Sequence, residues 1–176
     1  VSVHLDNSPT NEPPLFTFTA NDTNLESMWI EDVEITINGT LPSTIWESLP
    51  EGESQLTFAA VDEAGNEAQE TATIIKDTSF EGLSVDEPQQ IVISSPASIT
   101  GSVTDAHFDS LTAIVLQGER SWTAEIVTVQ GELEIEMSQE LFNDLDQCNF
   151  TVLLSAIDGA GNESPEHSIT LCKDTI

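Results

Sequence analysis

The stretch that decides the fold occurs twice in the chain. Leu56–Glu67 reads LTFAAVDEAGNE and Val152–Glu163 reads VLLSAIDGAGNE, six of twelve positions being identical at an offset of 96. Each copy begins with apolar and β-branched residues and ends in Gly-Asn, a pattern typical of a strand that runs into a tight turn. Lys-Asp-Thr follows each copy, at 76–78 and at 173–175, with an offset of 97.

A weaker repeat lies upstream of each copy. Phe16–Ser27 (FTFTANDTNLES) matches Ile99–Ser110 (ITGSVTDAHFDS) at an offset of 83, which aligns Asp22 with Asp105. The larger offset downstream predicts an insertion in the second copy, which we expect around Gly131–Asp146. The repeats predict two homologous units, 1–78 and 79–176, in which 79–90 is a linker or a first strand. Because both ends fall at repeat boundaries, we expect a piece of a longer tandem array or a processed mature chain.

Short strand patterns run through both units. They are rich in β-branched residues or alternate in polarity, and turn residues bound most of them. Their spacing favours an all-β antiparallel sandwich in each unit. A Ser at its start makes Ser138–Leu145 the one expected helical turn. The predicted strands are Leu15–Ala20, Val33–Asn38, Leu56–Val61, Ala72–Ile75, Ile91–Ser94, Ile99–Thr104, Thr112–Leu116, Leu133–Met137, Val152–Ile157 and Ser168–Cys172.

The charge of the chain limits its partners. Of 176 residues, 32 are acidic and only three are Lys or Arg, for a formal net charge of −29. Nucleic-acid binders need a basic face, and so do proteins that dock on anionic membranes. No apolar run approaches the roughly 20 residues of a membrane span. Because the uncompensated charge destabilises the compact state, we expect a saline or calcium-containing environment.

The repeated turn and its following strand resemble the Ig-like repeats of large bacterial surface proteins and adhesins. The matching residues are Ala60–Asn66 with 76–78, and Ala156–Asn162 with 173–175. The resemblance implies two tandem Ig-like antiparallel β-sandwiches in an extracellular or cell-surface protein. Such domains serve as stalks, spacers, adhesive tips and accessory modules of enzymes, so the fold leaves the function open.

The aspartate that opens each repeated turn has two interpretations. Asp62 and Asp158 can accept N–H groups of their own loops, which needs no ligand. In an Ig-like sandwich, however, this loop and the preceding B–C loop lie at the same end, where the previous domain also ends. The resemblance implies calcium at such junctions, where it stiffens some tandem adhesin arrays, and carboxylates suit that ion. The predicted metal ligands are Asp77, Asp105, Asp109 and Asp158 for the second unit, and Asp22 and Asp62 for the first.

The two cysteines, Cys148 and Cys172, both fall in the second unit. If Asp158 pairs with Asn162 across the turn, the residue numbers of each pair on the two strands add to 320. Cys148 then faces Cys172, with their Cα atoms within disulfide range. We therefore predict a disulfide and an oxidising compartment. The apolar pattern disagrees with this pairing. Phe150, Val152 and Leu154 mark the inner face of their strand, which includes Cys148. Ile169 and Leu171 mark the inner face of the other strand, which excludes Cys172. A bulge or a shifted register would reconcile the two, and two small buried thiols are the alternative.

These features predict a structural or adhesive segment, a stalk or extender of a bacterial surface protein, and not an enzyme. Its partners would be neighbouring Ig-like domains or subunits, or a cell-surface glycan or protein. One alternative is a carbohydrate- or protein-binding module. Another is a filament subunit that assembles by strand exchange through an edge strand, with Ser79–Gln90 as the suspected segment. Trp29, Trp46 and Trp122 are expected in or near the core, or else exposed as a platform for sugars.

Overall fold

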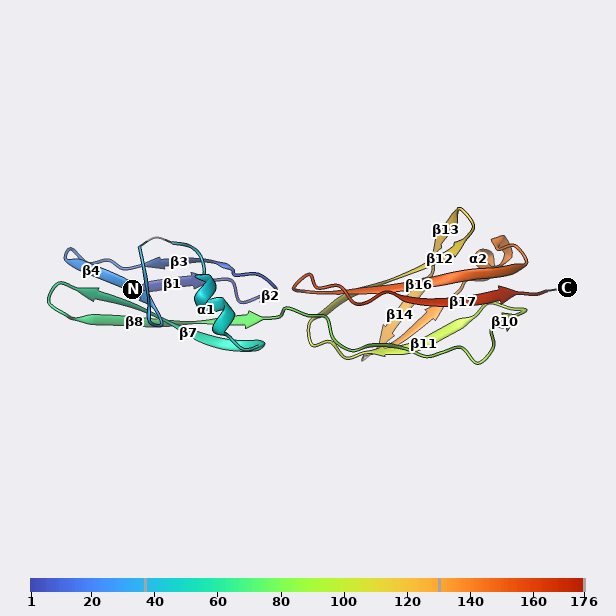
Figure 1. Ribbon diagram of the computed structural model, residues 1–176, viewed down its shortest axis with the longest axis horizontal. Coiled ribbons are helices and arrows are strands. Elements are labelled where there is room, and N and C mark those ends of the chain that lie inside the picture. Colours follow the sequence, from blue (N-terminus) through green and yellow to red (C-terminus); the bar gives the residue numbers. More distant parts are fainter. Residues whose placement is uncertain (37, 130, 176) are drawn as a thin grey trace. The chain divides into compact units, whose positions relative to one another are not determined.

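The computed structural model describes residues 1–36, 38–129 and 131–175. Its contacts divide the chain into two compact units, Val1–Thr78 and Ser79–Ile176 (Figure 1). In these described ranges, each unit contains two β-sheets and one short helix. The predicted all-β class is therefore confirmed, and each unit is an Ig-like sandwich with its apolar core between the sheets.

Unit 1 pairs a small sheet with a larger one. The small sheet has the order β1-β3-β6 and the larger one β2-β8-β7-β4-β5. Helix α1 (Ser43–Ser48) connects the two sheets between β6 and β7. Alternate residues of the central strands, such as Phe16, Phe18 and Phe58, are buried between the sheets. The strands are β1 Ser2–Leu5, β2 Pro9–Thr10, β3 Leu15–Thr19, β4 Leu25–Ile30, β5 Val33–Ile35, β6 Gly39–Thr40, β7 Gly52–Asp62 and β8 Glu67–Lys76.

Unit 2 repeats this plan with more strands. Its sheets have the orders β14-β15-β11-β9 and β10-β17-β16-β12-β13, and helix α2 (Gln139–Asp144) precedes β16. Strand β9 pairs with β11, so the segment 79–90 contains the first strand of the unit. The strands are β9 Leu83–Val85, β10 Val92–Ile93, β11 Ser98–Val103, β12 Phe108–Gln117, β13 Arg120–Thr123, β14 Glu125–Val129, β15 Glu132–Glu136, β16 Cys148–Asp158 and β17 His167–Lys173.

The insertion in unit 2 lies earlier than the sequence predicted. Helices α1 and α2 occupy corresponding places in the two units, so the prediction that the insertion lies around Gly131–Asp146 is wrong. The extra residues form the far half of β12, the edge strand β13, and β14. Strand β12 follows β16 as far as the pair Leu116–Thr151, whereas β4 follows β7 only to the pair Ile30–Phe58. The weak upstream repeat gave no signal for where the match ended.

The predicted helix at Ser138–Leu145 is confirmed as α2. The Ser138 hydroxyl accepts the N–H of Leu141 (3.1 Å), as an N-cap does. Its counterpart α1 was not predicted, because Pro42 stands in its N-cap position and makes no side-chain cap. Neither helix in the described part of the chain has the length and hydropathy needed to span a bilayer.

The hairpin of β16 and β17 changes register along its length. Next to the turn, Asp158 N–H donates to Asn162 O (3.1 Å) and Ser164 N–H donates to Ala156 O (2.9 Å), so these positions add to 320 as predicted. In the main ladder Cys148 pairs with Lys173 and Asn149 with Cys172, so positions there add to 321. One extra residue in the segment 164–166 accounts for the shift.

The predicted pairing of Cys148 with Cys172 is therefore wrong, and the structure has both as free thiols. Phe150 faces Leu171 and Val152 faces Ile169, which places all four apolar side chains on the core side. A register one residue away would turn one strand's apolar face to solvent. A bulge is thus present, but it satisfies the apolar pattern by separating the cysteines and does not reconcile that pattern with a disulfide.

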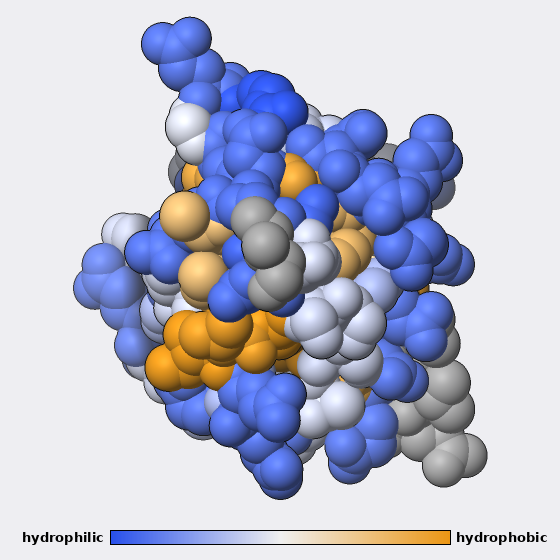
Figure 2. All heavy atoms as spheres, turned by 90° about the vertical axis from the view of Figure 1, so that its right-hand side faces the viewer, coloured by the Kyte–Doolittle hydropathy of each residue, from blue (hydrophilic) through white to orange (hydrophobic). Residues whose placement is uncertain are grey.

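The surface is largely hydrophilic, as the face drawn in Figure 2 shows, with a hydrophobic area on that face. Among the described residues, exposed large apolar side chains include Ile91 (63% exposed) and Val92 (56%) at the start of β10. The tryptophans are in or near the core, as expected: Trp46 is buried, and Trp29 and Trp122 are half-buried.

Candidate functional site

The two Asp-x-Ala-Gly-Asn turns are closed by their own aspartates. In unit 2, Asp158 Oδ1 accepts the N–H groups of Ala160 (2.9 Å) and Asn162 (2.8 Å), and its Oδ2 accepts the Asn162 side-chain amide (2.8 Å). Gly161 has a φ of +87°, which glycine adopts without strain. This geometry is the one expected for a structural turn.

The turn in unit 1 has the same hydrogen bonds. Asp62 Oδ1 accepts the N–H groups of Ala64 (2.9 Å) and Asn66 (2.8 Å), and Oδ2 accepts the Asn66 side-chain amide (2.8 Å). The Asn66 side chain, together with the backbone N–H groups of Asn66, Ala64 and Gly65, holds the pKa of Asp62 below its ordinary value of 3.8. Hydrogen bonds to the ionised carboxylate favour that form.

Another predicted aspartate in each unit caps a loop. In unit 1 this is the loop between β3 and β4, and in unit 2 it is the loop between β11 and β12. Asp22 Oδ1 accepts Asn24 N–H (2.7 Å), and Asp105 Oδ1 accepts His107 N–H (2.8 Å). Asp105 also accepts, through Oδ2, the N–H of Glu81 (2.9 Å), where the chain enters unit 2. The predicted alignment of Asp22 with Asp105 therefore matches their local geometry.

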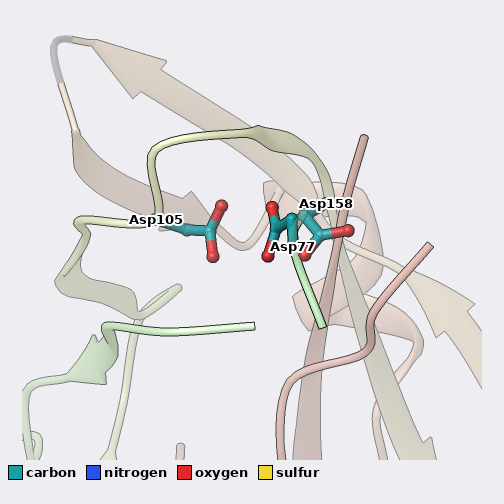
Figure 3. Close-up of side chains that lie close together, drawn as sticks. All are labelled: Asp77, Asp105 and Asp158. Carbon is teal, nitrogen blue, oxygen red and sulfur yellow. The ribbon is translucent and has the colours of Figure 1, made fainter. Parts of the chain in front are cut away.

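Unit 2 brings two of the predicted ligands together. Asp105 and Asp158 each have a carboxylate oxygen within 4.8 Å of the other. Figure 3 draws both side chains. Asp158 is only 3% exposed, and Asp105 is half-buried. Two negative charges at that separation repel by on the order of 3 kcal/mol at an effective dielectric constant near 20. In unit 1, Asp22 and Asp62 line one pocket of about 150 Å³.

The remaining predicted ligands lie elsewhere. Asp109 is exposed and sits at the register irregularity where β12 begins, outside the Asp105–Asp158 pair. Asp77, which Figure 3 also labels, belongs to unit 1, where its backbone N–H donates to Thr10 O (2.9 Å).

The three basic side chains of the chain all have structural partners away from the pair. Lys173 Nζ donates to the carbonyls of Phe142 (2.7 Å) and Leu145 (2.6 Å), at the end of α2. Lys76 Nζ does the same for Leu49 (2.9 Å) at the end of α1. Arg120 pairs with Asp146 and lies over the Trp122 ring. No lysine or arginine is therefore left to neutralise Asp105 and Asp158.

The lysine caps were missed by the sequence reasoning. In the sequence, the Lys of each Lys-Asp-Thr marks the repeat and indicates no particular contact. Its signal was present: two of only three basic residues recur at the same place in the two units. What they bind could not be read from the motif, since the carbonyls they cap lie about 30 residues earlier in the chain.

Comparisons with known proteins identify similar folds at low sequence identity. No protein family and no curated protein matched the sequence. Fibronectin(III)-like modules of CbhA from Clostridium thermocellum match 98% of this chain and 94% of their own at 12% identity and a TM-score of 0.44. A 1.5-MDa bacterial ice-binding adhesin matches 99% of this chain and 64% of its own at 18% identity and a TM-score of 0.48. A Ca²⁺-stabilised adhesin of an Antarctic bacterium matches 98% of this chain and 49% of its own at 14% identity and a TM-score of 0.45.

Proposed function

We propose that this chain is an extender segment of a bacterial surface protein, in which calcium stiffens the connection between two Ig-like units. The ligands in this proposal are Asp77 of unit 1 and Asp105 and Asp158 of unit 2. The observation that carries it is the Asp105–Asp158 pair, two carboxylates held close together without a lysine or arginine. A divalent cation removes the repulsion that this arrangement imposes on the folded state.

The connection between the units supports the participation of Asp77. On the unit 1 side, the Thr78 N–H and hydroxyl donate to Glu51 (3.0 and 2.9 Å). On the unit 2 side, Phe80 packs against the core and Glu81 is bound to Asp105. Asp77 is four residues before Glu81, so the chain keeps it within about 14 Å of that anchor.

The oxygens of the pair suit a hard cation. Each carboxylate oxygen has two lone pairs, and the hydrogen bonds that hold the turns leave some of them for an ion. Calcium takes six to eight oxygen ligands, and backbone carbonyls and water complete such a shell. In unit 1, Asp22 and Asp62 hold the corresponding places and line one pocket, and the third ligand there would come from a preceding domain.

The test is thermal unfolding in excess EDTA and in millimolar calcium at matched ionic strength, with magnesium as a second control. We expect calcium to raise the unfolding midpoint of unit 2 specifically, because an ion that binds only the folded state stabilises it. Equal midpoints in calcium and EDTA would reject the calcium site and leave the turns as structural loops.

Variants locate the effect. Asp77→Asn and Asp105→Asn are expected to abolish the calcium-dependent rise, whereas Asp109→Asn, on the exposed start of β12, retains it. Asp158→Ala is less informative, since it also removes three hydrogen bonds that close its turn. The proposal assigns no catalytic role, and its partners are adjoining Ig-like units at the cell surface.

A further inference from the structure

Unit 1 lacks a stretch of strand that unit 2 possesses. In unit 2, β12 accompanies β16 as far as the pair Leu116–Thr151. In unit 1, β4 accompanies β7 only to Ile30–Phe58, and the residue that corresponds to Thr151 is Gln55. The first half of β7 therefore has β8 on one side, and no described strand on the other.

Glu31 directly follows β4, at the point where the corresponding strand of unit 2 continues. Its N–H donates to Thr57 O (2.9 Å), one position beyond the last pair of the β4–β7 ladder, Ile30–Phe58. The backbone then turns away with a φ of +53° at Glu31. Its side-chain Oε1 accepts the Thr57 N–H (2.6 Å), in the place of a strand carbonyl.

The next ladder positions of β7 face the vacant side. Backbone groups alternate in direction along a strand, so Glu53 and Gln55 point theirs to the same side as Thr57. In unit 2 the corresponding positions are occupied: Thr151 pairs with Leu116, and Asn149 O accepts the Gln117 side-chain amide (3.3 Å).

In unit 1 a groove of about 770 Å³ lies at this place. Its lining includes the apolar side chains Val33, Ile45, Leu49 and Leu56, and its only charged residues are Glu31 and Asp32. An incoming strand would thus find backbone groups along one wall, apolar side chains beneath and carboxylates at one end.

We propose that this groove binds an extended, cationic peptide segment of a partner protein, which adds to the sheet as a strand antiparallel to β7. Unit 2 shows the fit, because its own β12 fills the equivalent place and Val115 there is fully buried. The acidic lining selects a basic segment. A second copy of this chain is disfavoured because it brings a further net charge of −29.

The test uses a synthetic peptide with the sequence Thr112–Gln117 flanked by two lysines at each end. Amide hydrogen exchange, followed by NMR, reports the ladder residue by residue. In the free protein we expect the Gln55 amide to exchange fast and those of Ser54 and Leu56, which face β8, to exchange slowly. The peptide should slow hydrogen exchange of the Gln55 amide at least tenfold. The same peptide, N-methylated at alternate peptide bonds, should not slow this exchange.

Three variants separate strand addition from charge attraction alone. Gln55→Pro removes the N–H on the vacant side and should abolish binding, with folding checked by its thermal midpoint. Asp32→Lys should weaken binding about tenfold, whereas Glu63→Lys, an equal charge change on the exposed β7–β8 turn, should leave it unchanged. The proposal is overturned if Gln55 is already protected in the free protein, if millimolar peptide leaves its exchange unchanged, or if a glutamate-flanked peptide binds equally well.

Discussion

Lys173 connects two parts of unit 2 that are distant in sequence. Its side chain is buried, donates to carbonyls at the end of α2 and lies over the Phe142 ring, 4.8 Å from the centroid. The last turn of α2 contains no basic residue of its own. The carbonyls at the C-terminal end of a helix need hydrogen-bond donors, and a cation there also interacts favourably with the helix dipole.

Replacing Lys173 by Met should lower the free energy of unfolding of unit 2 by about 2–4 kcal/mol, because buried carbonyls lose their donor. Lys76→Met in unit 1 is the matched control and should lower stability less, since that side chain is 12% exposed. Urea denaturation measures both. Equal losses, or none, would contradict the assigned role of the buried lysine.

Cys148 occupies a backbone position that suits glycine. Its φ is +89°, the same as that of Gly52 at the corresponding place in unit 1. A left-handed backbone disfavours residues with a Cβ by about 1–2 kcal/mol. Cys148→Gly should therefore raise the stability of unit 2 by about 1 kcal/mol, and Gly52→Ala should lower that of unit 1 similarly, as chemical denaturation can show. A destabilised Cys148→Gly would mean that the thiol contributes packing that exceeds the strain.

The Asp62 turn provides a pH prediction. Since Asn66 holds the pKa of Asp62 below 3.8 in the folded protein, the turn contributes stability at pH values above the pKa of the unfolded state. That contribution is lost as the pH falls through the folded-state pKa. NMR titration of the Asp62 carboxyl should give a midpoint below 3.8, and Asn66→Ala should move it upward. An unchanged midpoint in the variant would exclude Asn66 as the cause.

At the scale of elements, the hairpins β7–β8 and β16–β17 show how one residue changes a strand pairing. The pairs of β7 with β8 keep one register from Gly52–Lys76 to Val61–Glu67. In unit 2 the ladder shifts by one between the turn and Leu154–His167. The offset between repeats rises from 96 to 97 across this segment, which records the extra residue in the sequence itself.

The shifted register predicts the state of the cysteines. Adjacent positions on a strand point to opposite faces, so Cys148, opposite Lys173, and Cys172, opposite Asn149, are separated. Thiol titration of fresh, unreduced protein under denaturing conditions should therefore find two free thiols per chain. Fewer than two would mean that the ladder rearranges or that the thiols pair between molecules.

At the scale of the whole molecule, charge is the dominant feature. The three basic residues all stabilise local structure, which leaves the acidic surface uncompensated. Repulsion among like charges destabilises a compact chain. The charge is thus expected to link the stability of both units to the ionic strength of the medium.

Sodium chloride should raise the thermal midpoints of both units between about 0.01 and 1 M, as the screening length falls from about 30 to about 3 Å. Repeating the series with a neutral osmolyte separates screening from general exclusion effects. Midpoints that do not change with salt would show that the carboxylates are too dispersed to matter.

The candidate site was predictable in part. The sequence predicts Asp105 and Asp158 as ligands because both belong to loops at the same end of a sandwich, and the structure does bring them together. Asp109 is predicted as a member of the same loop as Asp105, but the irregular start of β12 leaves it exposed. A four-residue separation in a loop does not determine a direction in space, so the sequence could not separate these two aspartates.

By itself the sequence determined the class of fold, the repeat, the turns and the acidic character. These follow from local patterns: polarity that alternates along a strand, Gly and Asn at positions of special backbone geometry, and composition. Only the tertiary structure decided the cysteine pairing, the lysine caps and the vacant ladder positions beside Gln55. Each depends on contacts between residues that are distant in the chain, and a shift of one residue, or the loss of one half-strand, reverses the outcome.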